Sequence, residues 1–395
     1  MDSPIDREIS RAGEVPNERP SISHGGVAGT LLHSRTMTVP RFRFDCAVLL
    51  AALVCLPLAC TPEEAGNPAA GPATGEATGG EAAGGTSDKP TIALVMKDLG
   101  NEFFQTMAEG ARAFQAEDPQ RFELLVDGIQ NEQDLNRQVG IVNELTARGV
   151  DAIVLAPADS KALVQAVAAA REAGIVVINI DNRLDAEKLA AADLTIPFVG
   201  PDNRAGARTV GDYLAGELPE GARVAILEGI PSAFNAVERR AGFEEAMEAA
   251  GAEVVEVQSA RWEMNLANQI ASAMLSKHGD LDALLASNDT MALGALAARE
   301  TAGRDEVLIV GFDNIDAARA KVQSGELLAT ADQHADQLAV FGIEAALAQL
   351  AGSSPDDRQT PVDLVTAESL AGDSGESDAN ATKATSDTTE TATNR

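Results

Sequence analysis

The chain has 395 residues, which is enough for about two domains. Its formal net charge of −31 at pH 7 argues against nucleic acid as a partner, because phosphate groups repel an acidic surface. The 3 cysteines lie within the first 60 residues and no Cys/His spacing typical of a metal site occurs, so the sequence predicts neither an internal disulfide in the mature protein nor a bound metal.

The first element along the chain is a secretory signal. Residues 41–60 read RFRFDCAVLLAALVCLPLAC, with arginines before a short apolar run and small residues before Cys60. A membrane span needs about 20 apolar residues, and this run is shorter. Cys60 and the polar stretch after it resemble a bacterial lipoprotein processing site, with simple cleavage and release as the alternative. We expect a signal peptide at 37–60 with lipidation of Cys60, and we interpret residues 1–36 as a mis-called N-terminal extension.

Two segments have compositions that cannot form a core. Residues 61–89 are rich in Gly, Ala, Thr, Pro and Glu and are expected to form a flexible tether. Residues 371–395 are polar and predict a disordered tail. The globular part is therefore expected between residues 90 and 370.

Within this part, apolar runs alternate with amphipathic segments. The runs predict strands at 91–96, 122–126, 152–155, 175–180, 197–199, 223–227, 253–257, 283–285, 307–310 and 327–331. Helical spacing begins at Phe103, and further helices are predicted at 131–148, 160–173, 203–217, 235–250, 264–277 and 290–302. Strand–helix repeats of this kind predict an α/β fold with two doubly wound parallel-sheet lobes, with an eight-stranded β/α barrel as the alternative.

Polar and aromatic side chains follow the predicted strands at their carboxyl ends, where open α/β sheets bind ligands. Each has a simpler explanation, such as a helix N-cap for Asn288 or core packing for Phe103. Their recurrence at one topological position favours a binding site, because carboxylates, amides and cations satisfy buried hydroxyl groups while aromatic rings cover the faces of a sugar ring. Lys97 and Arg239 balance Asp181 and Asp313 in charge, which favours a neutral polyhydroxylated ligand. No Gly-rich phosphate loop follows a strand and no cofactor is predicted.

Several of these motifs resemble one family. They are TIALVMKDLGNEFFQTMAEGA from residue 91, VINIDNR from 177, GIPSAFNAVERRAGFEEA from 229, LLASNDTMALGALAA from 284, VLIVGFDN from 307 and ATADQ from 329. They are similar to the periplasmic sugar-binding proteins of ABC transporters, in the ribose/allose/galactose-binding group. The resemblance implies a type I periplasmic binding protein, with two Rossmann-like lobes joined by a three-crossover hinge. It places one lobe at 90–201 plus 334–362 and the other at 202–333 plus 363–370, the last segment being a strand.

The resemblance also implies ligand contacts and partners. Lys97 matches a lysine of the allose-binding branch, and Asn182 replaces an arginine of the ribose-binding branch. A neutral monosaccharide, allose- or ribose-like, would be clamped by hinge closure and delivered to a membrane permease. We expect a monomer that is periplasmic or at the cell surface and anchored to the membrane through Cys60. The implied ligand contacts are Lys97, Asn101, Phe103, Phe104, Asp181, Arg239, Trp262, Asn288, Asp313 and Gln333.

Two other functions use the same fold. A sensory protein would present its closed form, with a sugar or autoinducer bound, to a membrane receptor or kinase. A repressor of this fold needs an N-terminal helix-turn-helix, and a signal peptide and tether stand there instead. An enzyme is not expected, because no Ser–His–acid set, metal cluster or phosphate loop is found and paired carboxylates alone do not make a glycosidase.

Overall fold

The computed structural model describes residues 89–372, all of which belong to one compact unit of the chain. The predictions for residues 1–36, the signal peptide at 37–60, lipidation of Cys60, the tether up to residue 88 and the tail from residue 373 lie outside the described residues. None of the helices within 89–372 is long and apolar enough to cross a membrane.

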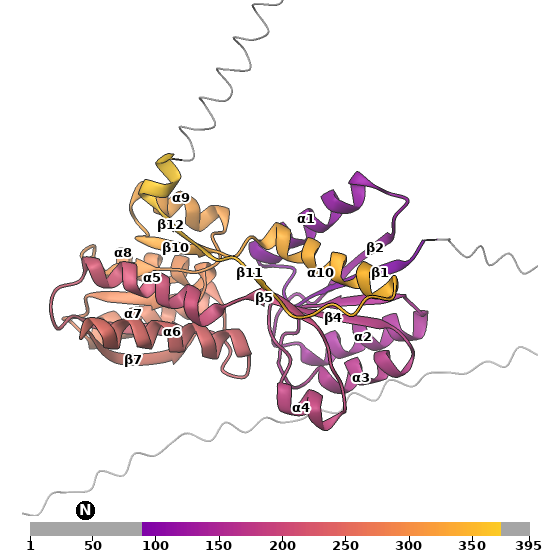
Figure 1. Ribbon diagram of the computed structural model, residues 1–395. Helices are drawn as coiled ribbons and strands as arrows, with labels where there is room; N and C mark the ends of the chain where they lie inside the picture. Colours follow the sequence, from indigo (N-terminus) through magenta and orange to yellow (C-terminus); the bar gives the residue numbers. More distant parts are fainter. Residues whose placement is uncertain (1–88, 373–395) are drawn as a thin grey trace, which may run out of the picture. The chain divides into compact units, whose positions relative to one another are not determined.

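Two six-stranded sheets form the framework, one in each lobe (Figure 1). The first has the order β11-β5-β4-β3-β1-β2, and all its pairs are parallel. The second has the order β12-β10-β9-β8-β6-β7, and only β12 runs antiparallel to its neighbour. The first sheet contains β1 (Thr91–Met96), β2 (Glu123–Gly128), β3 (Ala152–Leu155), β4 (Val176–Ile180), β5 (Phe198–Pro201) and β11 (Arg358–Thr360). The second contains β6 (Arg223–Glu228), β7 (Glu253–Ser259), β8 (Ala283–Ala286), β9 (Leu308–Val310), β10 (Ala329–Asp332) and β12 (Asp363–Thr366).

Helices cover both faces of each sheet. On the first sheet, α1 (Glu102–Glu117) and α10 (Ala335–Leu350) pack together, and α2 (Leu135–Arg148) and α3 (Val164–Glu172) pack together on the other face (Figure 1). On the second sheet, the two pairs are α5 (Asn203–Glu217) with α6 (Phe234–Ala250) and α7 (Met264–Lys277) with α8 (Asp289–Ala302). The short helices α4 (Ala186–Ala191) and α9 (Asp316–Ser324) complete the lobes.

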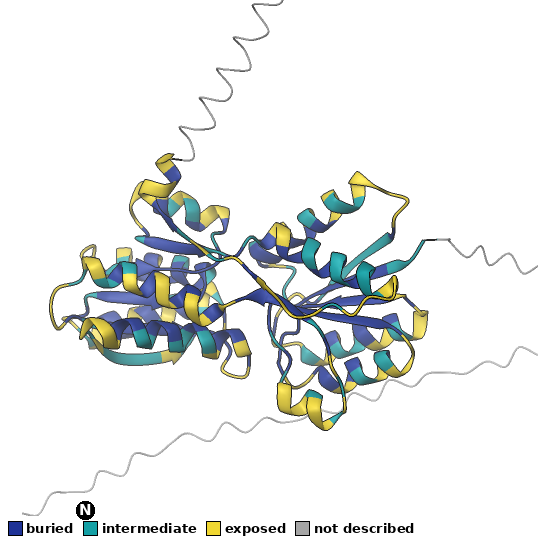
Figure 2. Ribbon diagram, in the orientation of Figure 1, coloured by how far each residue is buried: buried dark blue, intermediate teal, exposed yellow. Residues whose placement is uncertain are grey.

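Burial on both faces explains why the strands read as continuous apolar runs. In β1, Ile92 and Leu94 join the core under α1 and α10, whereas Ala93 and Val95 join the core under α2 and α3. Figure 2 shows these central strands buried and the outer surfaces of the helices exposed. A strand with one face exposed to solvent would alternate polar and apolar residues instead.

The chain passes between the two sheets three times. It does so from β5 into α5, from β10 into α10, and from β11 into β12. Two separate sheets joined in this way confirm the predicted pair of doubly wound lobes, and the barrel alternative is wrong.

The structure corrects several element boundaries. The last strand was expected to reach residue 370, but β12 ends at Thr366 and residues 367–372 are helical. Thr366 Oγ1 accepts a hydrogen bond from the Ser369 amide while Ser369 Oγ accepts one from the Thr366 amide, which is a capping box. Likewise α2 begins at Leu135 and not at residue 131, because Asp134 caps it, and α3 begins at Val164 and not at residue 160. The three-residue β11 was missed because it contains no apolar run.

Candidate ligand-binding site

A buried pocket lies where the carboxyl ends of strands from both sheets meet. Its cavity volume is about 10 Å³, room for about one water molecule, so a larger ligand enters only when the side chains or lobes around it move apart. Every residue that lines it is buried. The first lobe contributes Lys97, Asn101, Phe103, Phe104, Glu132 and Asp181, and the second contributes Asn235, Arg239, Trp262, Asn288 and Asp313. Nine of the ten candidates therefore line one pocket, and Gln333 lies behind it, donating to Asp313 Oδ1 at 2.6 Å.

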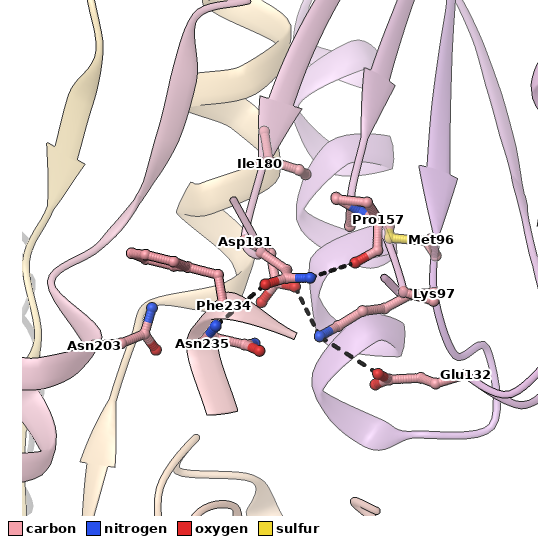
Figure 3. Close-up of polar contacts among 12 residues, drawn as sticks. Met96, Lys97, Glu132, Pro157, Ile180, Asp181, Asn203, Phe234 and Asn235 are labelled. Atoms are coloured by element: carbon pink, nitrogen blue, oxygen red, sulfur yellow. Dashed lines mark hydrogen bonds and ion pairs between the residues drawn. The ribbon is translucent and has the colours of Figure 1, made fainter. Parts of the chain in front are cut away.

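Lys97 is the cation of the first lobe and lies between two carboxylates (Figure 3). Its Nζ atom is 3.1 Å from Asp181 Oδ2 and 3.6 Å from Glu132 Oε2. The ammonium also lies 5.5 Å from the ring centre of Phe104 and 5.7 Å from that of Trp262, in cation–π range. Burial lowers the pKa of Lys97, but attraction to Asp181 and its hydrogen bond, with a contribution from Glu132 where that group is ionised, outweigh burial, so the pKa lies above its usual value and the side chain stays charged.

Glu132 is a pocket residue that the sequence analysis missed. It lies in the turn after β2, a segment that was predicted to be helical. Its place just beyond the carboxyl end of a strand was the signal that could have identified it. Burial raises the pKa of Glu132 to about 8, although Lys97 opposes the shift. Glu132 is therefore mostly protonated at pH 7, and the charges of Lys97, Arg239, Asp181 and Asp313 still sum to zero.

Arg239 is the cation of the second lobe and is held from three sides. Its guanidinium donates to Asn203 Oδ1 at 2.8 Å, to the Ser287 carbonyl at 2.9 Å and to Asp313 Oδ1 at 3.1 Å. It also lies 3.9 Å from the ring centre of Phe312, which fixes its plane. Burial raises the pKa of Asp313 to about 6, against the attraction of Arg239.

Two asparagines in the pocket also cap helices. Asn101 Oδ1 accepts from the Phe103 amide at 3.0 Å, and Asn288 Oδ1 accepts from the Met291 amide at 2.9 Å. The capping interpretation is therefore correct for Asn288, and Asn101 caps its helix in the same way; the amide nitrogens of both are the groups that can donate into the pocket. The next residue, Asp289, does not line the pocket. It is fully buried, and its Oδ1 atom accepts a hydrogen bond from the Thr330 hydroxyl at 2.7 Å.

Asn182 does not line the pocket. Its side chain donates to the Pro157 carbonyl at 2.9 Å and accepts from the Asn235 amide at 3.2 Å. Asn182 thus links the first lobe to the start of α6.

Backbone strain is concentrated at the pocket. Asp181, Trp262 and Asp313 have φ values of 62°, 68° and 125°, in the region that favours glycine. Residues in such conformations cost of order 1–3 kcal/mol each and cluster at functional sites. The Trp262 ring also lies directly over Gly229, where an added Cβ would approach the indole to 2.0 Å, so glycine is required there.

Several buried polar atoms at the pocket have no hydrogen-bond partner within residues 89–372. A buried group of this kind costs about 1–3 kcal/mol unless a ligand or water satisfies it. In the same part of the chain, no cluster of His, Cys, Asp and Glu side chains is arranged to hold a metal ion. The atoms of pocket residues and their neighbours without a hydrogen-bond partner are Glu132 Oε2, Asp181 Oδ2, Asn235 Oδ1, Trp262 Nε1, Ser287 Oγ and Gln333 Oε1. Two of them, Glu132 Oε2 and Asp181 Oδ2, instead form the ion pairs with Lys97.

Two α/β lobes with a polar pocket at their facing strand ends define a two-lobed binding protein. Residues 92–354 match the model of the periplasmic binding protein domain. The chain therefore belongs to the periplasmic binding protein family, and because this is a family of solute-binding proteins, the prediction that the chain is not an enzyme is confirmed.

This chain aligns with nearly the whole length of several individual relatives. The chain is 54% identical over 288 residues to the D-ribose/D-allose-binding protein of Pseudomonas aeruginosa, covering 71% of this chain and 90% of that protein. It is 36% identical to the ribose import binding protein RbsB of Escherichia coli, covering 70% of this chain and 90% of that protein. Among solved structures, it resembles an ABC transporter solute-binding protein from Burkholderia multivorans with a TM-score of 0.69 and 52% identity, covering 70% and 99%. A second such protein, from Actinobacillus succinogenes with bound D-allose, has a TM-score of 0.68 and 35% identity, covering 71% and 98%.

Proposed function

We propose that this protein captures a neutral monosaccharide of the D-allose or D-ribose type between its lobes and delivers it to an ABC transporter permease. The observation that carries the proposal is the set of unpartnered polar atoms around a buried pocket with aromatic walls. These atoms include both acceptors and donors, such as Asn235 Oδ1 and Trp262 Nε1, and hydroxyl groups both donate and accept. The net charge of the pocket suits a neutral ligand.

The candidate residues take different roles in this proposal. Asp181 and Asp313 accept hydrogen bonds from sugar hydroxyls, Lys97 and Arg239 donate, and Asn101 and Asn288 donate through their amide nitrogens. The rings of Phe103, Phe104 and Trp262 cover the faces of the sugar, while Gln333 holds Asp313. Glu132 is added to this set as a protonated carboxyl that can donate a hydrogen bond at neutral pH.

The relatives support the choice of sugar. The protein from Pseudomonas aeruginosa that shares 54% of its residues is named for both D-ribose and D-allose. Lys97 faces the pocket, in agreement with the allose branch of the resemblance. We further propose that the mature protein is a monomer, attached by a lipid on Cys60 to a bacterial membrane, in the periplasm or at the cell surface.

A sugar panel tests the proposal. The melting temperature of the purified protein should rise with D-allose or D-ribose, because a ligand that binds only the folded state stabilises it by RT ln(1 + [L]/Kd), about 2.7 kcal/mol at a hundredfold excess over Kd. Isothermal titration calorimetry with the same sugars gives the affinity, and L-arabinose, D-glucose and myo-inositol test selectivity. The absence of a shift and of binding heat across a broad sugar, polyol and inositol panel would refute the proposal.

Glu132 makes a separate prediction about pH. Its pKa in the folded protein is about 8, against 4.5 for an ordinary glutamate, so between these values the folded state keeps a proton that the unfolded state has lost. The folded state is therefore progressively destabilised as pH rises, by up to about 1.4 kcal/mol per pH unit. Glu132→Gln, which cannot ionise, should be more stable than the wild type at pH 8 and differ little at pH 4.5.

Denaturant unfolding at both pH values measures the difference. Glu144→Gln is the matched control, because Glu144 is an exposed glutamate paired with Arg137 at the surface. If Glu132→Gln and the wild type lose stability in parallel between pH 4.5 and 8, burial does not penalise the ionised form of Glu132, and the prediction is wrong.

A further inference from the structure

Three helices of the second lobe begin without a cap of their own. The N-cap residues of α6, α7 and α9 are Ala233, Glu263 and Ile315, and none of these side chains accepts a hydrogen bond from its helix. Helices α5 and α8 of the same lobe are capped locally, α5 by Asp202 and α8 by Asn288. The first amides of any helix lack partners within it and need acceptors from elsewhere.

The first lobe supplies acceptors for two of these helices. At the start of α6, the Phe234 amide donates to Ser160 Oγ at 3.0 Å, and the Asn235 amide donates to Asn182 Oδ1 at 3.2 Å. Figure 3 shows Asn235 at the start of its helix, facing the strand ends of the first lobe.

The same arrangement recurs at α9. The amide of its first residue, Asp316, donates to Glu102 Oε1 at 2.7 Å, and Glu102 belongs to the first turn of α1 in the other lobe. A carboxylate at this position also interacts favourably with the positive end of the α9 dipole. At α7, the remaining helix, Gln133 of the first lobe donates to the side chain of the N-cap residue Glu263. All four hydrogen bonds thus join the first lobe to the N-terminal end of a second-lobe helix.

These helix ends are next to the pocket residues of the second lobe. Helix α6 carries Asn235 and Arg239, and Trp262 and Asp313 lie shortly before α7 and α9 respectively. Closure of the lobes brings acceptor and amide together, whereas hinge opening separates them. The cross-lobe bonds therefore form in the same step that brings the second-lobe residues over the pocket.

We propose that Glu102, Ser160 and Asn182 are positioning residues that cap α6 and α9 across the cleft and thereby stabilise the closed form. This inference rests on the proposed function, because it concerns the closure that holds the ligand. The three residues do not contact the ligand; they raise its affinity by adding bonds that exist only when the lobes are closed. Their loss speeds ligand release, since most effects of this kind appear in the dissociation rate.

Variants of Glu102 test the cap. Glu102→Ala should bind D-allose about fivefold more weakly, the loss expected for one N-cap. Glu102→Gln keeps the Oε1 acceptor and should retain most of the affinity. Glu109→Ala removes the same charge from an exposed position of the same helix and should bind like the wild type. The melting temperature of the ligand-free protein separates a loss of closure from a general loss of stability. Wild-type affinity in Glu102→Ala, or equal losses in Glu102→Ala and Glu109→Ala, would overturn the proposal.

Amide hydrogen exchange tests the bonds themselves. In the protein saturated with D-allose, Glu102→Ala should speed exchange at Asp316 and leave Phe234 unchanged, while Ser160→Ala should do the reverse. Ser160→Thr keeps a hydroxyl acceptor and should restore protection. If sugar binds the wild type but exchange at both amides is the same in the wild type and the variants, the cap is wrong and the proposed function stands. If no sugar binds the wild type, the proposed function fails, and the inference, which rests on it, fails with it.

Discussion

Replacing Arg239 with alanine should reduce ligand affinity by about a hundredfold or more and also destabilise the protein. The side chain is buried and forms three hydrogen bonds, to Asn203, Ser287 and Asp313. Removing one partner of a buried ion pair costs about 3 to 5 kcal/mol, because the remaining charge is left without compensation. The carboxylate of Asp313 would be the group left in this state, and its pKa should rise further above 6 once the cation is gone.

The neighbouring residue provides the control for this variant. Arg240 is half-exposed and pairs with Glu228 at 3.0 Å and Glu244 at 2.8 Å, away from the pocket. Arg240→Ala should therefore bind the sugar like the wild type and lose little stability. Calorimetry measures affinity, and denaturant unfolding measures the free energy of unfolding. If the two adjacent variants lose affinity equally, Arg239 has no special role in the site.

Replacing Asp181 with alanine should weaken sugar binding to a similar degree with a smaller effect on folding. A buried sugar hydroxyl would lose its acceptor, and Lys97 would lose the partner at 3.1 Å. Glu132 can compensate for the second loss, because removal of the Asp181 charge lowers the pKa of Glu132 and favours its ionised form beside Lys97. The free energy of unfolding should thus fall by less than in Arg239→Ala.

Asp356→Ala is a suitable control for Asp181→Ala, because Asp356 is an exposed aspartate in the first lobe. The measurement is the thermal shift and the binding heat with the sugar that stabilises the wild type. An Asp181→Ala variant that keeps its affinity within about threefold of the wild type would show that Asp181 is not an acceptor for the ligand.

Most of the fold could be predicted because it depends on local sequence patterns. The strands β1 and β3 and the helices α5 and α7 have the predicted bounds, since apolar runs and helical spacing are properties of short segments. The elements that were missed have weak local signals. The strand β11 exists because its backbone pairs with β5, about 160 residues earlier in the chain, and its own sequence contains no apolar run.

Nine of the ten candidate residues meet at one pocket for a similar reason. The carboxyl ends of parallel strands lie at one edge of a sheet, so a residue such as Asp181 can be assigned to that edge from the sequence alone. Asn101 and Asn288 are also helix caps, a role that is equally readable from short patterns.

What the sequence by itself determined is the alternation of strands and helices, the edge at which polar side chains gather, and the four charges of the pocket that sum to zero. Only the tertiary structure decided which of these side chains contact each other. It placed Glu132 beside Lys97, turned Asn182 toward Asn235, and brought Glu102 to the start of α9 from more than 200 residues away in the chain. The reason is physical: a helix or strand is set by interactions within a few residues, whereas an ion pair, a raised pKa or a cross-lobe cap depends on distances between segments that meet only in the folded chain.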